Sequence, residues 1–351
     1  MTFPARTRIF AFLGVACLPL LVGSFAALRR ASAQEIRGLS QVATFQFDAP
    51  IRKLTFRPGT SSLLIATPYL AKLVDVSTRN TLRVKTIGYP EVAFRDAQFT
   101  RDGRMLAFVF NGTRNGIGVL DVEAWREVYP RLPTGDDFVE RITFSRRGDH
   151  FISYGAPHHF AVWKRGEKGF SQDVDAQAKF QIPKQRVRAV EYSPDGTKLA
   201  VGGDQALTVW ATSKGEPQTA LRKWGDPRVC TALAFSRDGR DLYSLDAASR
   251  LARFDAENGE LRSWIYTPET EADVEVISRF ALLPNAILTA SGSGAIARLD
   301  TRSSGRPFPI GRVSKNDEEV RSLAVSSDGK YVALGTEAGT VSVYEAAPSG
   351  N

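Results

Sequence analysis

Cysteine and histidine are scarce in this chain, which has two cysteines and three histidines among 351 residues. Cys17 lies in an apolar segment near the N-terminus, so once that segment is removed Cys230 has no partner for an internal disulfide. We expect Cys230 to be a small packed residue. His158 and His159 are adjacent, and adjacent strand residues point to opposite faces, so we predict an exposed polar turn rather than a metal site.

The chain also lacks the local motifs of several common activities. It has no G-x-S-x-G nucleophile elbow, no H-E-x-x-H pair and no phosphate-cradling glycine loop. It has no run of basic residues, and its net charge of +8 includes four arginines from the first 33 residues, which contain no acid. Without those four arginines the charge is +4. We therefore expect no nucleic-acid partner, no metal and no other cofactor.

The first 33 residues have the pattern of a targeting segment. Arg6 and Arg8 precede an uncharged and mainly apolar run over residues 9–28, and Ala31-Ser32-Ala33 is a small-x-small cleavage site. This predicts a secretory signal peptide, with the mature chain over residues 34–351 in the periplasm or secreted. Twenty apolar residues would also span a bilayer, so an uncleaved anchor in the inner membrane is the alternative.

The most informative feature present is a sevenfold repeat between residues 51 and 345. Each unit has a short apolar strand that ends in a large or apolar residue, here called the anchor, followed by a tight turn. The anchors are Phe56, Phe99, Phe144, Tyr192, Phe235, Leu282 (or Ala281) and Val325. The turns read Arg57-Pro58-Gly59, Arg101-Asp102-Gly103, Arg146-Arg147-Gly148, Pro194-Asp195-Gly196, Arg237-Asp238-Gly239, Leu283-Pro284-Asn285 and Ser327-Asp328-Gly329. Gly or Asn closes every turn. Because these residues tolerate positive φ better than others do, we expect positive φ at that position.

The spacing of the units predicts a β-propeller with one blade for each unit. With Ala281 as the sixth anchor, the anchors are separated by 43, 45, 48, 43, 46 and 44 residues, and several strand-like segments fall within each interval. A period of roughly 45 residues with several strands per unit is typical of propeller blades. The fold class is therefore all-β, a seven-bladed β-propeller over residues 34–351.

The two ends of the chain predict how the ring closes. Six units have a fourth strand-like segment, whereas the seventh ends at Asn351, six residues after Glu345. A strand-like run over residues 41–47 stands just before the first unit. We predict that this N-terminal strand pairs with the last blade, which removes an exposed sheet edge.

The units resemble WD repeats. The resemblance rests on the S-x-D-G hairpin and on bulky-acidic pairs such as Phe254-Asp255 and Leu299-Asp300, and it covers residues 41 to 348. No Gly-His dipeptide precedes a first strand, and only the fourth unit has an Asp, Asp204, six residues before its bulky residue. The family's internal hydrogen-bond tetrad is therefore expected to be mostly absent. The resemblance implies a non-enzymatic scaffold that binds a protein partner.

Candidate binding residues lie where the innermost strands begin. Four residues before the anchors, the units carry Arg52, Arg95, Glu140, Arg188, Thr231, Ile277 and Arg321. Arg52, Arg95, Arg188 and Arg321 around one channel mouth would attract a carboxylate, a phosphate or an acidic peptide. The alternative is that these arginines form ordinary ion pairs with loop acids such as Asp96, Asp136, Glu140 or Glu319.

The loops between blades carry aromatic and arginine residues of the types enriched at protein interfaces. We expect these loops to share a face with the turns between second and third strands. The interface candidates are Tyr89, Phe138, Arg186, Trp224 and Arg228. The alternative for Trp224 and Phe138 is that they cap blade interiors. The partner would be a protein that presents an acidic segment, or another subunit of an envelope complex.

The rival hypothesis is a propeller enzyme, either a periplasmic hydrolase or lactonase or a quinoprotein-like oxidoreductase. The segment 255–264 distantly resembles the tryptophan-docking motif of quinoprotein propellers, but it occurs once and its spacing differs by one residue. Metal-dependent propeller enzymes need carboxylates, Asn or His at the channel, whereas the position that can be aligned carries mostly arginine. The sequence therefore favours binding over catalysis.

Overall fold

The computed structural model describes residues 36, 38–86, 92–113, 115–180, 182, 185–213, 216–224, 229–268, 276–301, 308–313 and 318–346. Side chains are described for all of these except 213, 216–224 and 308. The predicted signal peptide or anchor lies outside these residues. Within them, no helix has the length and apolar character needed to cross a membrane.

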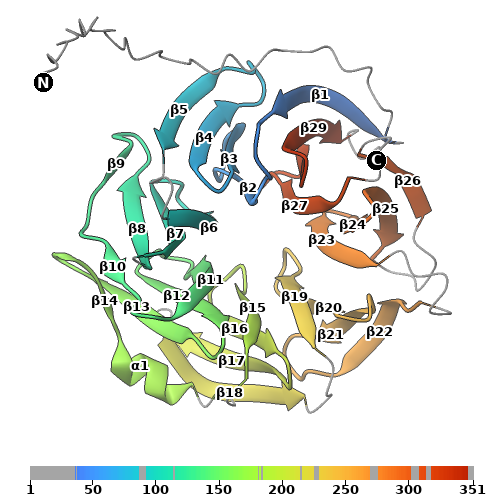
Figure 1. The fold of residues 1–351 in the computed structure, drawn as a ribbon. Helices are drawn as coiled ribbons and strands as arrows, with labels where there is room; N and C mark the ends of the chain where they lie inside the picture. Colours follow the sequence, from blue (N-terminus) through green and yellow to red (C-terminus); the bar gives the residue numbers. More distant parts are fainter. Residues whose placement is uncertain are drawn as a thin grey trace, which may run out of the picture.

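Seven antiparallel sheets are arranged in a ring, as the sequence predicts (Figure 1). In blades 1 to 3 the strands are β2 (Lys53–Phe56), β3 (Ser62–Ala66), β4 (Leu70–Asp75), β5 (Thr81–Thr86); β6 (Val92–Phe99), β7 (Met105–Gly112), β8 (Gly116–Asp121), β9 (Arg126–Glu127), β10 (Leu132–Pro133); and β11 (Phe138–Phe144), β12 (His150–Ala156), β13 (Phe160–Gly166), β14 (Gly169–Gln172). The six-residue helix α1 (Val174–Lys179) follows blade 3. In blade 2 the outermost strand is divided into β9 and β10.

Blades 4 to 6 each have four strands in chain order. They are β15 (Val187–Tyr192), β16 (Lys198–Gly203), β17 (Leu207–Ser213), β18 (Glu216–Trp224); β19 (Cys230–Phe235), β20 (Asp241–Asp246), β21 (Leu251–Asp255), β22 (Leu261–Tyr266); and β23 (Ile277–Leu283), β24 (Ala286–Ser291), β25 (Ala295–Asp300), β26 (Phe308–Arg312). Cys230, the first residue of β19, is buried, which agrees with its expected role as a packed residue. Burial raises the pKa of its thiol to about 11.

The last blade combines both ends of the described chain, and the predicted ring closure is confirmed. It contains β27 (Val320–Val325), β28 (Tyr331–Thr336), β29 (Thr340–Ala346) and β1 (Leu39–Gln46). Strand β1 pairs antiparallel with β29, from Leu39 opposite Ala346 to Gln46 opposite Thr340. The N-terminal strand therefore supplies the outer strand that the seventh unit lacks (Figure 1).

The Asp-Gly turns hold their shape through short hydrogen bonds. In blade 4, Ser193 Oγ donates to Asp195 Oδ1 (2.6 Å) and accepts from Lys198 N (2.9 Å), while Gly196 has a φ of 74°. Asn285 does not share the positive φ that we expected at the turn-closing position. The turn between the paired residues Leu283 and Ala286 consists of Pro284 and Asn285. Proline holds φ negative at the first of these two positions, which excludes the hairpin turn types that need positive φ there.

Six of the seven innermost strands contain a β-bulge at the same place. The bulged residues are Arg95, Glu140, Arg188, Thr231, Ser278 and Arg321. This identifies Leu282, not the alternative Ala281 used for the spacing, as the anchor of the sixth unit, and it corrects the residue at this position from Ile277 to Ser278. A bulge places two residues opposite one and redirects the strand, so it determines which side chains face the channel.

Equivalent tryptophans in blades 3 and 4 differ in whether their indole N–H has a hydrogen-bond acceptor. In blade 3, Trp163 Nε1 donates to Ser153 Oγ (2.8 Å), and His159 lies between Ser153 Oγ (Nε2, 2.8 Å) and Asp137 Oδ2 (Nδ1, 3.0 Å). Because a carboxylate only accepts, Nδ1 of His159 carries the proton. In blade 4, Trp210 Nε1 has no partner among the described residues, since Val201 stands where blade 3 has Ser153.

The blade 3 network corrects the expectation of an exposed histidine turn. His158 is exposed, but His159 is only 8% exposed and joins the turn to the preceding interblade loop. The spacing of histidines tests only for metal ligands, whereas His159 hydrogen-bonds to a serine and a carboxylate that are not adjacent to it in the sequence.

Candidate functional site

The ring has two faces, which we name by their connections. The loop face carries the interblade loops and the turns between second and third strands, and the turn face carries the hairpins between first and second strands. Backbone hydrogen bonds connect the interblade loops to the turns between second and third strands on the loop face, for example Asp204 N to Arg186 O (3.2 Å) and Glu337 N to Glu319 O (3.0 Å). This agrees with the sequence prediction that these loops and turns share a face.

A cavity of about 750 Å³ occupies the channel on the loop-face side. Its most regular feature is a ring of residues three before the anchors, here called the waist ring, all seven of which line the cavity. The waist ring consists of Lys53, Asp96, Arg141, Ala189, Ala232, Arg279 and Ser322. Seven cationic and three acidic side chains line the cavity in total, so its surface is strongly positive.

The four arginines chosen from the sequence divide into two groups. Arg52, Arg95 and Arg321 line the cavity, whereas Arg188 does not. Arg188 forms an ion pair with Asp204, and Arg321 forms ion pairs with Glu319 (3.1 Å) and Glu337 (2.8 Å). Arg52 and Arg95 have no ion pair with any described residue. Arg52 and Arg95 therefore fit the expected cluster of unpaired arginines, whereas Arg188 and Arg321 fit the alternative of ordinary ion pairs.

The loop candidates are only partly described. Phe138 begins β11, lines the cavity and is 52% exposed, so it does not cap a blade interior. Arg186 also lines the cavity and is paired with Glu140. Tyr89 and Arg228 lie outside the described residues, as does the side chain of Trp224.

Two arginines of the waist ring were missed by the sequence argument. Arg141 stands one residue after the position that we aligned, and Arg279 stands two residues after it because the sixth unit was misaligned by one; both directly follow a bulge. Arg141 has no partner among the described residues. Arg279 donates from Nε to Arg321 O (3.1 Å) and from Nη1 to Ser278 O (2.6 Å), so its partners are backbone carbonyls. An alignment shifted by one residue, with Leu282 as the sixth anchor, would have revealed both arginines.

The waist ring also holds neighbouring blades together. Asp96 is buried, forms an ion pair with Lys53 (2.7 Å) and accepts from Ile142 N (3.0 Å), so it connects blades 1, 2 and 3. Between the last blade and the first, Leu54 N donates to Ser322 Oγ (2.9 Å). Lys53, Asp96 and Ser322 therefore have partners within the protein, and we assign them a structural role.

Two of the charged residues that line the cavity, Arg279 and Glu191, have shifted pKa values. Arg279 has its pKa lowered to about 10, first by burial and then by the nearby positive charges of Arg141 and Arg321. Glu191 lines the same cavity and has no ion pair or hydrogen bond with a described residue. Burial raises its pKa to about 7 even though Lys53 opposes the shift.

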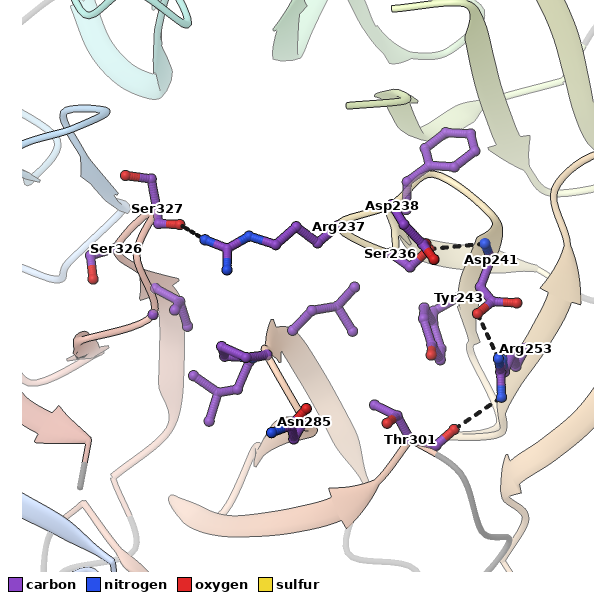
Figure 2. Close-up of a pocket in the computed structure, with 16 residues that line it drawn as sticks. Ser236, Arg237, Asp238, Asp241, Tyr243, Arg253, Asn285, Thr301, Ser326 and Ser327 are labelled. Atoms are coloured by element: carbon purple, nitrogen blue, oxygen red, sulfur yellow. Dashed lines mark hydrogen bonds and ion pairs between the residues drawn. The ribbon is translucent and has the colours of Figure 1, made fainter. Parts of the chain in front are cut away.

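A second cavity, of about 550 Å³, lies on the turn face between blades 5, 6 and 7. Figure 2 shows its main polar contacts: Arg237 Nη2 donates to Ser327 O (2.7 Å), and Arg253 joins Asp241 (2.7 Å) to Thr301 O (3.3 Å). These arginines already have partners in the protein. The loop-face cavity, with its unpaired arginines, is therefore the better candidate for ligand binding.

No group of three or more His, Cys, Asp or Glu side chains among the described residues is placed to hold a metal ion. The quinoprotein-like segment forms the end of β21, a turn and β22, where Asp255 pairs with Arg262.

Comparison with known families gives one match. The model of the WD domain, G-beta repeat, matches residues 177–211. This segment contains β15, β16 and most of β17 in blade 4, the unit that carries Asp204. No curated protein matches the chain. The matched repeat is one of the seven blades, and it indicates the same architecture as the ring.

Proposed function

Because the chain is a WD-repeat-like β-propeller, we propose that it is a non-enzymatic scaffold that binds an acidic segment of a protein partner at the loop-face mouth of its channel. Propellers of this kind typically act as protein-interaction platforms. We also propose that it acts outside the cytoplasm, because the pattern of residues 1–33 is that of an export signal or an N-terminal anchor.

The observation that carries this proposal is the uncompensated positive charge of the channel. Seven cationic side chains and three acidic ones line the cavity, and Arg52 and Arg95 have no carboxylate partner among the described residues. Guanidinium groups that are not already paired can form bidentate hydrogen bonds with carboxylates. A positive cavity also increases the rate at which an acidic partner is captured.

The site is rigid, which favours binding. Each cationic side chain stands on or beside an innermost strand held within a four- or five-stranded sheet. Phe138 adds an exposed aromatic ring at the rim, a residue type that often dominates interface energetics. Little ordering entropy is lost when a partner binds such a surface.

The test is binding of a fluorescent glutamate-rich peptide to the purified full-length protein, followed by fluorescence anisotropy. We expect simultaneous charge reversal of Arg52, Arg95, Arg188 and Arg321 to abolish binding. The matched control reverses four turn-face arginines, Arg57, Arg101, Arg146 and Arg237, and should retain binding. Equal binding by the wild type and the loop-face variant would refute the proposal. A pull-down from envelope extract with the same two variants then tests whether a native partner depends on the same face.

A further inference from the structure

We propose that the channel waist holds a single oxyanion, a carboxylate or a phosphate, between Arg141 and Arg279. The proposal deepens the proposed function, on which it rests only for the idea that a bound acidic segment supplies the anion. The arginines of the mouth would attract the segment, and the waist would receive one of its anionic groups.

The two arginines approach the channel from opposite sides. Arg141 belongs to β11 in blade 3 and Arg279 to β23 in blade 6, and these strands face each other across the ring in Figure 1. Both side chains line the same cavity. Their charges are close enough to interact, since Arg141 is one of the causes of the lowered pKa of Arg279. An anion between them would replace a repulsion with two attractions.

The acids around the waist do not neutralise this pair. Asp96 is engaged by Lys53 and by Ile142 N, and Glu140 is engaged by Arg186. Glu319, the one acid that acts on the pKa of Arg279, forms its ion pair with Arg321. Glu191 has no partner among the described residues, and Lys53 is the only cation that contributes to the shift of its pKa. The charge of the pair is thus available to a ligand.

The geometry of Arg279 suits an anion. Its Nε and one Nη1 hydrogen are used by the carbonyls of Arg321 and Ser278, which fixes the plane of the guanidinium. A guanidinium has five donors, so those of Nη2 and the second of Nη1 remain for an oxyanion. Arg141 has all of its donors free with respect to the described residues.

The waist is also wide enough. Ala189 and Ala232 occupy the waist ring in blades 4 and 5, and the cavity of about 750 Å³ far exceeds the volume of a phosphate or of a carboxylate on a side chain. The small residues leave room for the chain that carries the anion. The charged side chains of the waist ring fall into two groups. Arg141 and Arg279 are proposed to hold the anion, and Lys53 and Asp96 connect neighbouring blades.

Two probes separate the sources of the anion. Inorganic phosphate tests the waist alone, and the glutamate-rich peptide tests the waist together with the mouth; both are titrated calorimetrically into the full-length protein at low salt. We expect both to bind the wild type, and Arg141→Gln to weaken both at least tenfold. Arg126→Gln, which removes an exposed arginine from the outer edge of blade 2, should leave both affinities unchanged.

The outcomes distinguish this inference from the proposed function. If the peptide binds the wild type and Arg141→Gln equally, the waist site is refuted and the mouth remains. If phosphate binds and is lost in Arg141→Gln but no peptide binds, the waist site stands and the proposed function fails. If neither probe binds the wild type, both proposals fail.

A stability measurement excludes a structural role for Arg141. Without an anion and at low salt, Arg141→Gln should melt at or above the wild-type temperature, because it removes a repulsive charge. Phosphate should raise the melting temperature of the wild type and not that of the variant. A variant that melts well below the wild type, together with an equal phosphate-induced shift in both proteins, would overturn the proposal. Arg279→Lys keeps the charge but loses the planar fork, and it should weaken phosphate binding without loss of folding.

Discussion

Arginines on the two faces of this ring have different surroundings. On the turn face, arginines at the start of the hairpin turns donate to backbone carbonyls of a later blade. These bonds are Arg57 Nε to Gly103 O (2.9 Å), Arg101 Nη1 to Pro194 O (2.6 Å), Arg146 Nη1 to Asp195 O (3.1 Å) and Arg237 Nη2 to Ser327 O (2.7 Å). On the loop face, Arg52, Arg95 and Arg141 have no such bond to a described residue.

The comparison shows that an arginine's role depends on where its donors point. A turn-face arginine uses part of its fork to connect blades, so it contributes to closing the ring. A loop-face arginine without a partner adds charge to the channel and keeps its donors for a ligand. Arginine occurs on both faces, and the positions of nearby carbonyls and carboxylates separate its two roles.

The largest effect is expected at Asp96, the acid that fixes the loop-face side of the ring. Asp96→Ala leaves Lys53 unpaired and the buried amide of Ile142 without an acceptor. Removing one member of a buried ion pair typically costs about 3–5 kcal/mol, so we expect a loss of unfolding free energy of about 3 kcal/mol. Urea denaturation of the wild type and the variant measures this loss of unfolding free energy.

A conservative variant separates the two contributions of Asp96. Asp96→Asn retains an oxygen for Ile142 N and loses only the ion pair, so we expect a cost of about 1 kcal/mol. If Asp96→Ala itself changes stability by less than that, the loop-face side of the ring does not depend on its acids. The proposed difference would then fail, in which acids stabilise the loop-face side of the ring and arginines stabilise the turn face.

The second effect concerns Glu191 and its raised pKa. The folded protein holds the proton of Glu191 up to a pH of about 7, whereas the unfolded chain loses it near its ordinary pKa of 4.5. The wild type should therefore lose stability relative to Glu191→Gln as the pH rises from about 4.5 to about 7. A shift of this size corresponds to about 3 kcal/mol at most. Urea midpoints of both proteins at pH 4.5, 6 and 8 give the difference.

The result also tests whether the channel arginines are free. Glu191 faces a cavity that contains Lys53, Asp96, Arg141 and Tyr154. If an arginine of the channel were paired with Glu191, the carboxyl would ionise well below its ordinary pKa. The stability difference from Glu191→Gln would then stay constant between pH 4.5 and 8, and that outcome would contradict the description of these arginines as unpaired.

Much of the fold was predictable because the repeat is local. Three local patterns predicted the seven blades and the closing strand: the anchors, the Ser-x-Asp-Gly turns and the strand-like run over residues 41–47. Each pattern involves only a few neighbouring residues. The sixth unit was misaligned by one residue because its hairpin turn is shorter than the others.

The channel was less predictable because its chemistry depends on the bulges and on contacts between distant blades. The bulge determines that Arg141 and Arg279 belong to the waist ring, and no local pattern marks it in the sequence. The pairing of Arg188 with Asp204 joins an innermost strand to a turn of the same blade, which reduced the expected cluster of four arginines. Residue type predicted a positive channel, but not which charges remain free.

The smallest effect compares the two faces directly. The double variant Arg101→Gln/Arg237→Gln shortens two arginines whose guanidiniums connect blade 2 to blade 4 and blade 5 to blade 7. Because both side chains are exposed, we expect a loss of about 1 kcal/mol in unfolding free energy for the pair. Arg52→Gln/Arg95→Gln removes the same charge from the loop face and should leave stability unchanged or slightly higher, since no bond to a described residue is lost. The peptide affinity should change in the opposite sense, falling only for the loop-face pair. If both pairs alter stability and affinity alike, the arginines contribute through net charge alone, and the position of their donors has no bearing on their role.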